Sequence, residues 1–235
     1  MKKNLLLLIS MLWGGVTHGQ DWRIAPVVGL QVANINYSTA LKNALNDFNS
    51  TYSNVSISTG PALKMQIGAL LDYPFTDRLS FRTGLILNGK GGNTTYKISD
   101  YGVSAKVRST YSLNYLELPL LLSAAVGSND FRLEFGVVGG IAVSAKNKYR
   151  STDSYYGEYT GNLSIGNDRV DMVKPVELGF SIGLVKQLEV GRYPLEVGFH
   201  IQPSISKWNT SAKYIPEYFA RNLVIGMKAV YLFDL

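Results

Sequence analysis

The sequence predicts an all-β protein, an antiparallel up-and-down transmembrane β-barrel of about eight strands with a filled lumen. Three observations support this fold class. Apolar and polar residues alternate with period two through eight segments, as in strands with one apolar face. The connections between these segments alternate between short turns and long polar loops. After the first 20 residues no apolar run is long enough for a spanning helix, so a membrane-crossing fold must be a closed barrel.

Residues 1–20 have the features of a secretory signal peptide. Lys2 and Lys3 give a positive start, residues 5–13 are apolar, and small or polar residues follow as far as Gly19. The alternative is a membrane-anchoring helix, but the apolar run is only about half of the roughly 20 residues that a span requires. We therefore expect cleavage near Gly19 or Gln20 and one barrel domain over residues 21–235.

Composition excludes several classes of function. The chain has no cysteine, which rules out disulfides, thiolate metal sites, cysteine nucleophiles and a lipoprotein anchor. Charged residues make up only 17%, while 23 glycines and 15 tyrosines favour strands and turns. Removal of Lys2 and Lys3 lowers the net charge from +6 to +4. This excess is too small and too scattered to indicate nucleic-acid binding.

The eight predicted strands follow one another from residue 22 to the end of the chain. They cover residues 22–35, 63–73, 79–94, 111–126, 131–146, 173–188, 195–206 and 223–235. Alternation is clearest in the second, fifth, seventh and eighth. In residues 131–146 the odd positions from Phe131 to Ala145 form the apolar face, and the even positions from Arg132 to Lys146 form the polar or small face. Each segment has at least the roughly 9 to 11 residues that a tilted strand needs to cross a bilayer.

The connections predict a topology. Three are short and built from turn residues, at residues 74–78, 127–130 and 190–194. Four are long and polar, at residues 36–58, 96–110, 148–172 and 207–220. Outer-membrane barrels have short periplasmic turns and longer extracellular loops, so both mature termini are expected on the periplasmic side.

Alternation alone does not say which face points outward, and a soluble lipocalin-like barrel is the alternative. Two observations favour lipid outside. The polar face is rich in glycine and small residues, as a narrow interior requires, and aromatic residues gather near strand ends, as in interfacial girdles. The expected girdle residues are Tyr73, Phe75, Phe81, Phe131, Tyr193 and Phe233 near the short turns, and Tyr111, Tyr149, Trp208, Tyr214 and Tyr218 near the long loops.

Under the membrane interpretation the charged residues of the polar face point into the lumen. An eight-stranded barrel is just wide enough to be filled by side chains, and opposite charges there should pair, because an unpaired buried charge is costly. We therefore expect a plugged barrel rather than an open pore. The predicted lumen network consists of Arg23, Lys64, Arg82, Glu117, Arg132, Glu134, Glu177, Glu196, His200 and Lys228.

His200 is the one histidine left after the expected loss of His18. It shares the polar face with Glu196 and Ser204, and serine, histidine and glutamate are the side chains of a lipid hydrolase. Such an enzyme must present its site to the bilayer, whereas His200 faces the lumen. We therefore expect a hydrogen-bonded lumen histidine and no catalytic residue.

Two further motifs favour ordinary structural roles. Residues 89–92, Gly-Lys-Gly-Gly, lack the Gly-Lys-Ser/Thr ending of a phosphate loop and a following helix, so strand flexibility near the outer rim is expected. The third long loop contains four acidic residues without the regular spacing of a calcium loop. These residues are Asp153, Glu158, Asp168 and Asp171. A solvated loop is expected, with no metal and no cofactor.

Residues 40–48 in the first long loop place Leu41, Ala44, Leu45 and Phe48 at helical spacing. The pattern predicts a short amphipathic helix. It would lie at the rim, fold over the mouth or offer a surface to a partner.

Several stretches resemble one family. They are residues 114–122 (Asn-Tyr-Leu-Glu-Leu-Pro-Leu-Leu-Leu), 68–80, 84–92 and 29–34. They are similar to the outer-membrane β-barrel domain common in Bacteroidetes, of the PorT type, over nearly the whole mature chain. The resemblance implies an outer-membrane location, and its PorT branch is associated with the type IX secretion machinery. Within residues 114–122, Pro119 lacks a backbone donor, so an edge, a bulge or a locally unpaired position is expected.

The leading functional hypothesis is a non-enzymatic outer-membrane protein. It would act as an accessory or structural subunit of an envelope assembly such as the type IX machinery, with outer-membrane lipid and envelope proteins as partners. A stand-alone membrane-stabilising or small-solute barrel is the first alternative. A lipid-modifying enzyme based on His200 is the second.

Overall fold

A computed structural model describes most of the chain after the predicted signal peptide. The described residues are 22–51, 55–100, 103–127, 130–151, 158–168, 172–190, 193–209 and 219–234. The predicted signal peptide and its cleavage point therefore lie outside the described residues and stay predictions.

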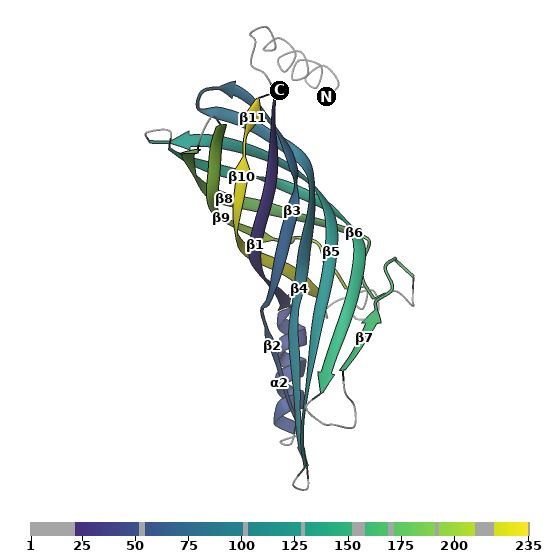
Figure 1. Ribbon diagram of the computed structural model, residues 1–235. Coiled ribbons are helices and arrows are strands. Elements are labelled where there is room, and N and C mark those ends of the chain that lie inside the picture. The colour runs from purple at the N-terminus through teal and green to yellow at the C-terminus, as the bar shows by residue number, and fades with distance from the viewer. Residues whose placement is uncertain are drawn as a thin grey trace.

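Eight antiparallel strands form a closed ring (Figure 1). They are β1 (Arg23–Tyr37), β3 (Ala62–Thr76), β4 (Leu79–Asp100), β5 (Val103–Val126), β6 (Phe131–Ser151), β8 (Val176–Val190), β9 (Tyr193–Pro203) and β10 (Ala220–Tyr231). Each pairs with its neighbours in chain order, and β1 closes the ring on β10 from Val27 opposite Val230 to Tyr37 opposite Ala220. The predicted up-and-down barrel is confirmed.

Side chains alternate between the two faces, and the apolar face points outward. On β3, Leu63 and Met65 are 73% and 61% exposed, whereas the next residue, Gln66, is buried. The same alternation leaves large apolar side chains exposed along the barrel strands and buries charged and amide side chains inside. A soluble barrel would have the reverse arrangement, so this orientation is that of a barrel surrounded by lipid.

A β-bulge in β6 reverses the alternation that the sequence predicted there. Asn114 of β5 lies opposite Ser144, but the next residue, Tyr115, lies opposite Ala142, which leaves Val143 without a partner. Beyond the bulge Ala145 is buried and Lys146 is exposed. The prediction that Ala145 faces outward and Lys146 inward was wrong, because an extra residue in one strand shifts the following side chains to the opposite face.

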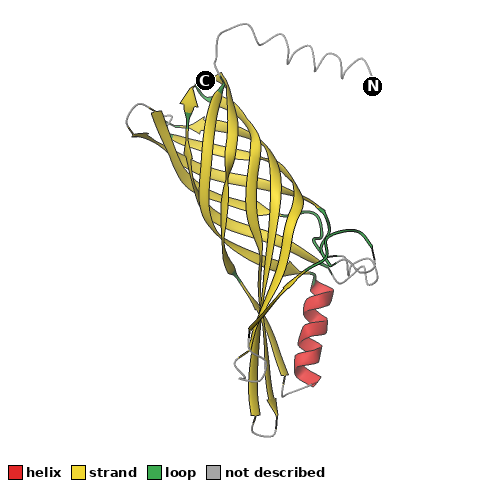
Figure 2. Cartoon of the chain, turned by 45° about the vertical axis from the view of Figure 1, so that its right-hand side comes forward, coloured by secondary structure: helices red, strands yellow, loops and turns green. Residues whose placement is uncertain are grey.

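The long connections contain more strand than predicted. Residues 96–110 were expected to be a loop, but β4 and β5 remain paired as far as Asp100 opposite Val103. This hairpin extends well beyond the ring (Figures 1 and 2). Two short strands widen the extension: β2 (Val55–Gly60) pairs with β4, and β7 (Glu158–Asn162) pairs with β6.

The amphipathic helix predicted at residues 40–48 is confirmed as α2 (Thr39–Thr51). Ser38 starts it, since the Leu41 amide donates to Ser38 Oγ at 3.2 Å, a typical N-cap contact. The helix does not fold over the mouth. It lies outside the ring beside the extended hairpin (Figure 2). No helix in the described part of the chain is long and apolar enough to span a membrane.

The short connections and the chain ends lie at one end of the barrel. β11 (Phe233–Asp234) follows β10 and pairs with the start of β1, Arg23 opposite Asp234. The β3–β4 turn is at this end too, as Figure 1 shows. In outer-membrane barrels the short turns are periplasmic, so we refer to this end as periplasmic and to the end with α2 and the extended hairpin as extracellular.

Aromatic residues gather at the periplasmic end, where Tyr73 contacts both Trp22 and Phe75, with ring centroids 4.9 and 5.3 Å apart. At the extracellular end two girdle assignments were wrong. Trp208 is buried inside, in an apolar cluster with Leu113 and Tyr115, and Tyr111 packs against the same cluster, its ring centroid 5.8 Å from that of Trp208. Tyr214 and Tyr218 lie outside the described residues.

Pro119 occupies a locally unpaired position, as expected. β4 pairs with β5 at Thr83 opposite Leu120 and again at Ile86 opposite Glu117, and the ladder skips the positions between them. The missing N–H donor of proline therefore faces a gap in the ladder. On its other side Pro119 remains in register with Val138 of β6.

Candidate functional site in the barrel lumen

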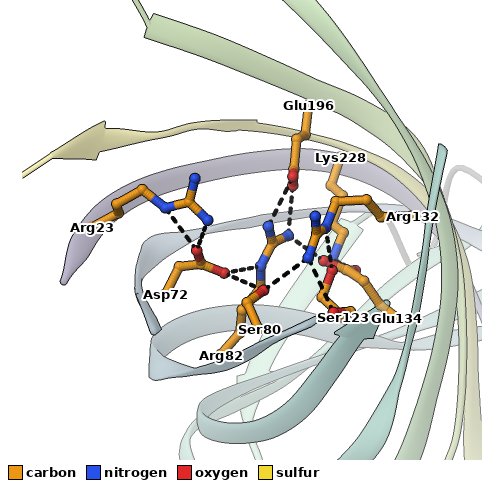
Figure 3. A network of polar contacts seen from close by, with 9 residues as sticks. All are labelled: Arg23, Asp72, Ser80, Arg82, Ser123, Arg132, Glu134, Glu196 and Lys228. Carbon is orange, nitrogen blue, oxygen red and sulfur yellow. Dashed lines mark hydrogen bonds and ion pairs between the residues drawn. The ribbon is translucent and has the colours of Figure 1, made fainter. Parts of the chain in front are cut away.

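Arg82 on β4 is the centre of a charge network in the periplasmic half of the lumen (Figure 3). Its side chain is fully buried and contacts carboxylates from three other strands. Arg82 Nε donates to Asp72 Oδ1 at 2.6 Å and Nη1 to Glu134 Oε1 at 2.6 Å. Both terminal nitrogens donate to the two oxygens of Glu196, at 2.5 and 2.8 Å. Such forked, charge-assisted contacts are the strongest that arginine makes.

Two further cations complete this network. Lys228 on β10 pairs with Glu134, and Arg23 on β1 pairs with Asp72, with its Nε donating to Oδ2 at 2.9 Å. Ser80 Oγ also donates to Asp72, at 2.8 Å. Strands β1, β3, β4, β6, β9 and β10 are thereby linked across the lumen.

Arg132 on β6 stands beside this network without a carboxylate of its own. Its Nε donates to Ser123 Oγ at 2.9 Å, and its Nη2 donates to Ser80 Oγ at 3.2 Å and to the Ser123 carbonyl at 3.1 Å. Within the described ranges no carboxylate oxygen lies within ion-pairing distance of its guanidinium. Arg132 as a whole is only 6% exposed.

Lys90 on β4 organises a second network in the extracellular half of the lumen. Its Nζ lies 2.6 Å from Glu117 Oε1 and 2.8 Å from Glu177 Oε1. Amide side chains satisfy the remaining carboxylate oxygens: Asn88 donates to Glu117 Oε2 at 2.8 Å and Asn222 to Glu177 Oε2 at 2.9 Å. Buried charges that are paired and fully hydrogen-bonded avoid the cost of an isolated ion.

The structure joins most of the predicted lumen residues, but not all of them. Arg82, Glu134, Glu196, Lys228 and Arg23 belong to the periplasmic network, and Glu117 and Glu177 to the extracellular one. Lys64 instead donates to Ser112 Oγ at 2.6 Å and stays half-buried.

His200 is buried, at 4% exposure, and neither ring nitrogen has a hydrogen-bond partner among the described residues. The expected hydrogen bond is therefore not made to a side chain in this part of the chain. A hydrolase arrangement is not assembled either. Ser204 Oγ donates to Glu177 rather than to His200, and both oxygens of Glu196 are bound by Arg82. A nucleophile must contact its base, and these side chains do not meet.

Sequence reasoning missed two central residues, Asp72 and Lys90. Asp72 lies in the predicted strand at residues 63–73 but is not in the predicted network, although it has the same parity as Lys64 of that network. Lys90 was considered only as part of a glycine-rich motif, yet it has the same parity as Arg82. Strand parity therefore contained the signal for both residues.

The remaining candidate motifs are also located. The glycines around Lys90 lie within strand β4, so residues 89–92 form no phosphate loop. Glu158 pairs with Lys148 and Arg150. Hydrogen bonds from both side chains lower the pKa of Glu158, and the one from Lys148 has the larger effect. Asp153 and Asp171 lie outside the described residues, and the described part contains no cluster of three or more metal-ligating side chains.

Packed apolar side chains fill the levels around the two networks. One cluster includes Val27, Leu70 and Val230, and another at the extracellular end includes Leu113, Tyr115 and Trp208. Between the networks, His200 and Gln66 line a cavity of about 20 Å³, room for about one water molecule. Between its two mouths the described lumen is filled by side chains.

A closed antiparallel ring with an apolar exterior and a charged, filled interior defines a membrane-spanning barrel of the outer-membrane class. The chain belongs to the outer membrane protein beta-barrel domain family, whose model matches residues 20–207. The protein is therefore an outer-membrane protein.

Solved structures with similar folds come from several bacteria. Neisserial surface protein A is 11% identical, with a TM-score of 0.41, and the match covers 93% of this chain and 100% of that chain. The attachment invasion locus protein Ail of Yersinia pestis is 9% identical, with a TM-score of 0.37, covering 91% and 99%. OprG from Pseudomonas aeruginosa is 12% identical, with a TM-score of 0.31, covering 92% and 98%. No curated protein sequence matches the chain.

Proposed function

We propose that this protein is a non-enzymatic outer-membrane barrel that serves as an accessory or structural subunit of an envelope assembly. One observation carries the proposal: buried ion pairs and apolar side chains occupy the lumen, so its interior offers neither a wide passage nor an assembled catalytic group. The surfaces at the two ends of the barrel then remain for function.

The extracellular extension is the larger of these surfaces. Strands β2, β4, β5, β6 and β7 continue as one sheet beyond the ring, with α2 beside it (Figures 1 and 2). Regular pairing makes this extension stiffer than a polar loop of the same length. A stiff projection suits contact with another protein.

The resemblance of residues 114–122 to PorT-type barrels supports a more specific form of the proposal, in which the assembly is the type IX secretion machinery. A deletion strain tests this form. We expect it to lose secreted cargo proteins from the medium while other outer-membrane proteins remain at normal levels. Unchanged secretion would contradict the type IX assignment. The general proposal of an accessory barrel is tested separately, by conductance and by shortening of the hairpin.

Conductance tests the filled lumen. We expect the purified protein in planar bilayers to show no steady, large single-channel steps, because charged side chains from opposite walls meet inside. As a comparison, replacement of Lys90, Glu117 and Glu177 together by serine removes the long side chains of one network, and we expect small steps to appear. Large steps from the unaltered chain would contradict the proposal.

Shortening the hairpin tests the contact surface. Tyr96 of β4 lies opposite Val107 of β5, so residues 97–106 can be replaced by Asn-Gly, the preferred two-residue hairpin turn. We expect proteins that co-purify in stoichiometric amounts with the full chain to be lost from the shortened one, whose barrel stays folded. A full chain that purifies alone would favour a stand-alone barrel instead.

A further inference from the structure

Arg132 is the one guanidinium of the periplasmic network that lacks a carboxylate among the described residues. The network contains four cations, Arg23, Arg82, Arg132 and Lys228, against three carboxylates, Asp72, Glu134 and Glu196. A nearly buried cation is costly unless a counter-charge compensates it. The serine contacts of Arg132 satisfy some of its donors but supply no negative charge.

Arg132 lines an open cavity at the periplasmic mouth of the lumen. The cavity measures about 350 Å³, at the lower end of the range for small-ligand pockets. Its polar lining consists of Arg23, Arg132, Thr76, Gln187, Asp77 and Asp234. These residues come from the ends of β1, β3, β6 and β8, the β3–β4 turn and β11, so the cavity opens toward the periplasm.

The charges of the lining specify the ligand. Ser80 and Ser123 occupy Nε and Nη2 of Arg132, whereas its Nη1 has no hydrogen-bond partner among the described residues and remains to donate to an oxyanion. Gln187 and Thr76 add neutral polar groups. Asp77 and Asp234 place two carboxylates in the same cavity, which repel a multiply charged anion and attract a cation. Opposite charges within one small cavity fit a ligand that carries both signs.

We infer that this mouth is a binding site for a short zwitterionic peptide of the periplasm, with a free N-terminal ammonium and a free C-terminal carboxylate. The carboxylate contacts Arg132, and the ammonium lies toward Asp77 and Asp234. A lipid headgroup does not have the same access, because Arg132 points into the lumen and not toward the lipid-facing side. The site requires no partner protein and is independent of the proposed assembly.

Binding of small peptides to the ¹⁵N-labelled full chain in non-ionic detergent tests the inference. The readout is the NMR shift of the arginine Nε–H groups, and the Arg132 signal is assigned by its loss in Arg132→Gln. The probes are the zwitterionic dipeptide Ala-Ala, its C-terminal amide, its N-acetyl form and inorganic phosphate. We expect Ala-Ala to bind about tenfold more tightly than the amide, because the charge-assisted hydrogen bond from Arg132 to the carboxylate is lost in the amide. We also expect it to bind more tightly than phosphate.

Variants separate the two halves of the site. Arg132→Gln should weaken Ala-Ala binding about tenfold, read on the Arg23 signal. Arg132→Lys should restore only part of the binding, because the lysine ammonium does not provide the separate donors with which a guanidinium contacts the serines and a ligand at the same time. The double variant Asp77→Asn with Asp234→Asn keeps Arg132 and should bind Ala-Ala and its N-acetyl form equally. Arg150→Gln, at the extracellular end, is the matched control and should change nothing.

Three results would overturn the inference. They are equal binding of Ala-Ala and its amide, undiminished binding in Arg132→Gln, and tighter binding of phosphate than of Ala-Ala. If Arg132→Gln fails to fold, the double variant Asp77→Asn with Asp234→Asn tests the inference instead, because both of those side chains lie at the mouth. An unchanged preference for Ala-Ala over its N-acetyl form in that double variant would refute the zwitterion assignment.

Discussion

Arg82 shows how one buried side chain stabilises a barrel whose lumen contains several carboxylates. Asp72, Glu134 and Glu196 all lie within 2.6 Å of its guanidinium nitrogens. Each carboxylate is buried, so each depends on a cation for compensation. Removal of Arg82 would leave Glu196 without its ion-pair partner, and Asp72 and Glu134 with one partner each, Arg23 and Lys228.

We therefore predict that Arg82→Met destabilises the barrel strongly. The free energy of unfolding should fall by about 3–5 kcal/mol, the usual cost of removing one partner from a buried ion pair. Urea unfolding of the protein in lipid vesicles, followed by tryptophan fluorescence, measures it. Arg78→Met is the matched control, because Arg78 is exposed in the β3–β4 turn. Equal losses in the two variants would contradict this role for Arg82.

Gly136 on β6 is a position where the approach of two strands requires glycine. A Cβ atom there would collide with the backbone carbonyl oxygen of Leu120 on β5, which has little freedom to move. At Gly139 on the same strand, a Cβ would meet Leu178 Cδ2 at 3.6 Å, an ordinary contact distance.

We predict that Gly136→Ala lowers the free energy of unfolding by about 1–3 kcal/mol, the usual cost of overpacking. Gly139→Ala makes the same chemical change without the collision, so it should be neutral or slightly stabilising. Parallel urea titrations of the two variants measure the difference. A loss in Gly139→Ala as large as that in Gly136→Ala would show that the collision is not the cause.

Among the elements, β2 has an edge that the helix α2 protects. The Asn49 side chain accepts a hydrogen bond from the Ile57 amide at 2.9 Å and donates to the Ile57 carbonyl at 3.3 Å. It thereby occupies backbone groups that an exposed edge strand would offer to another chain. The contact also fixes α2 beside the extension.

We predict that Asn49→Ala speeds hydrogen exchange at the Ile57 amide about fivefold, because a hydrogen bond contributes roughly 1 kcal/mol and that energy opposes opening. Exchange followed by NMR or mass spectrometry measures it. Asn43→Ala provides the control. Asn43 is exposed on the same helix, so both variants gain the same helix propensity. Unchanged exchange in Asn49→Ala would show that the side chain does not protect the edge.

For the whole molecule, the β1–β10 seam decides whether the sheet is a barrel. Leu30 and Met227 lie opposite each other across this seam, and both face lipid. Directly opposite residues of antiparallel strands have Cα separations of about 4.5–5.5 Å, within the range that a disulfide bridges. The natural chain contains no cysteine, so an engineered pair has no competitor.

We predict that Leu30→Cys combined with Met227→Cys forms a disulfide on mild oxidation of the folded protein. Mass spectrometry of the digested protein detects the linked peptides. Leu30→Cys with Leu178→Cys is the comparison. Leu178 also faces lipid but lies on β8, two strands from the seam, and this pair should stay reduced. Failure of the first pair to link would contradict closure of the ring.

The sequence by itself determined the eight strands of the ring, their apolar outer face and the long loops at one end. These are local properties, because alternation with period two places each side chain relative to its own strand only. Tertiary structure decided the rest. Arg82 meets Glu134 and Glu196, which are 52 and 114 positions away in the chain, only through the register of the closed ring. Likewise, the bulge at Val143 depends on how β5 and β6 pair, and it reverses Ala145 and Lys146. The alternation within one strand does not specify how that strand pairs with its neighbours. The partners in the lumen and the open periplasmic mouth could therefore be seen only in the folded barrel.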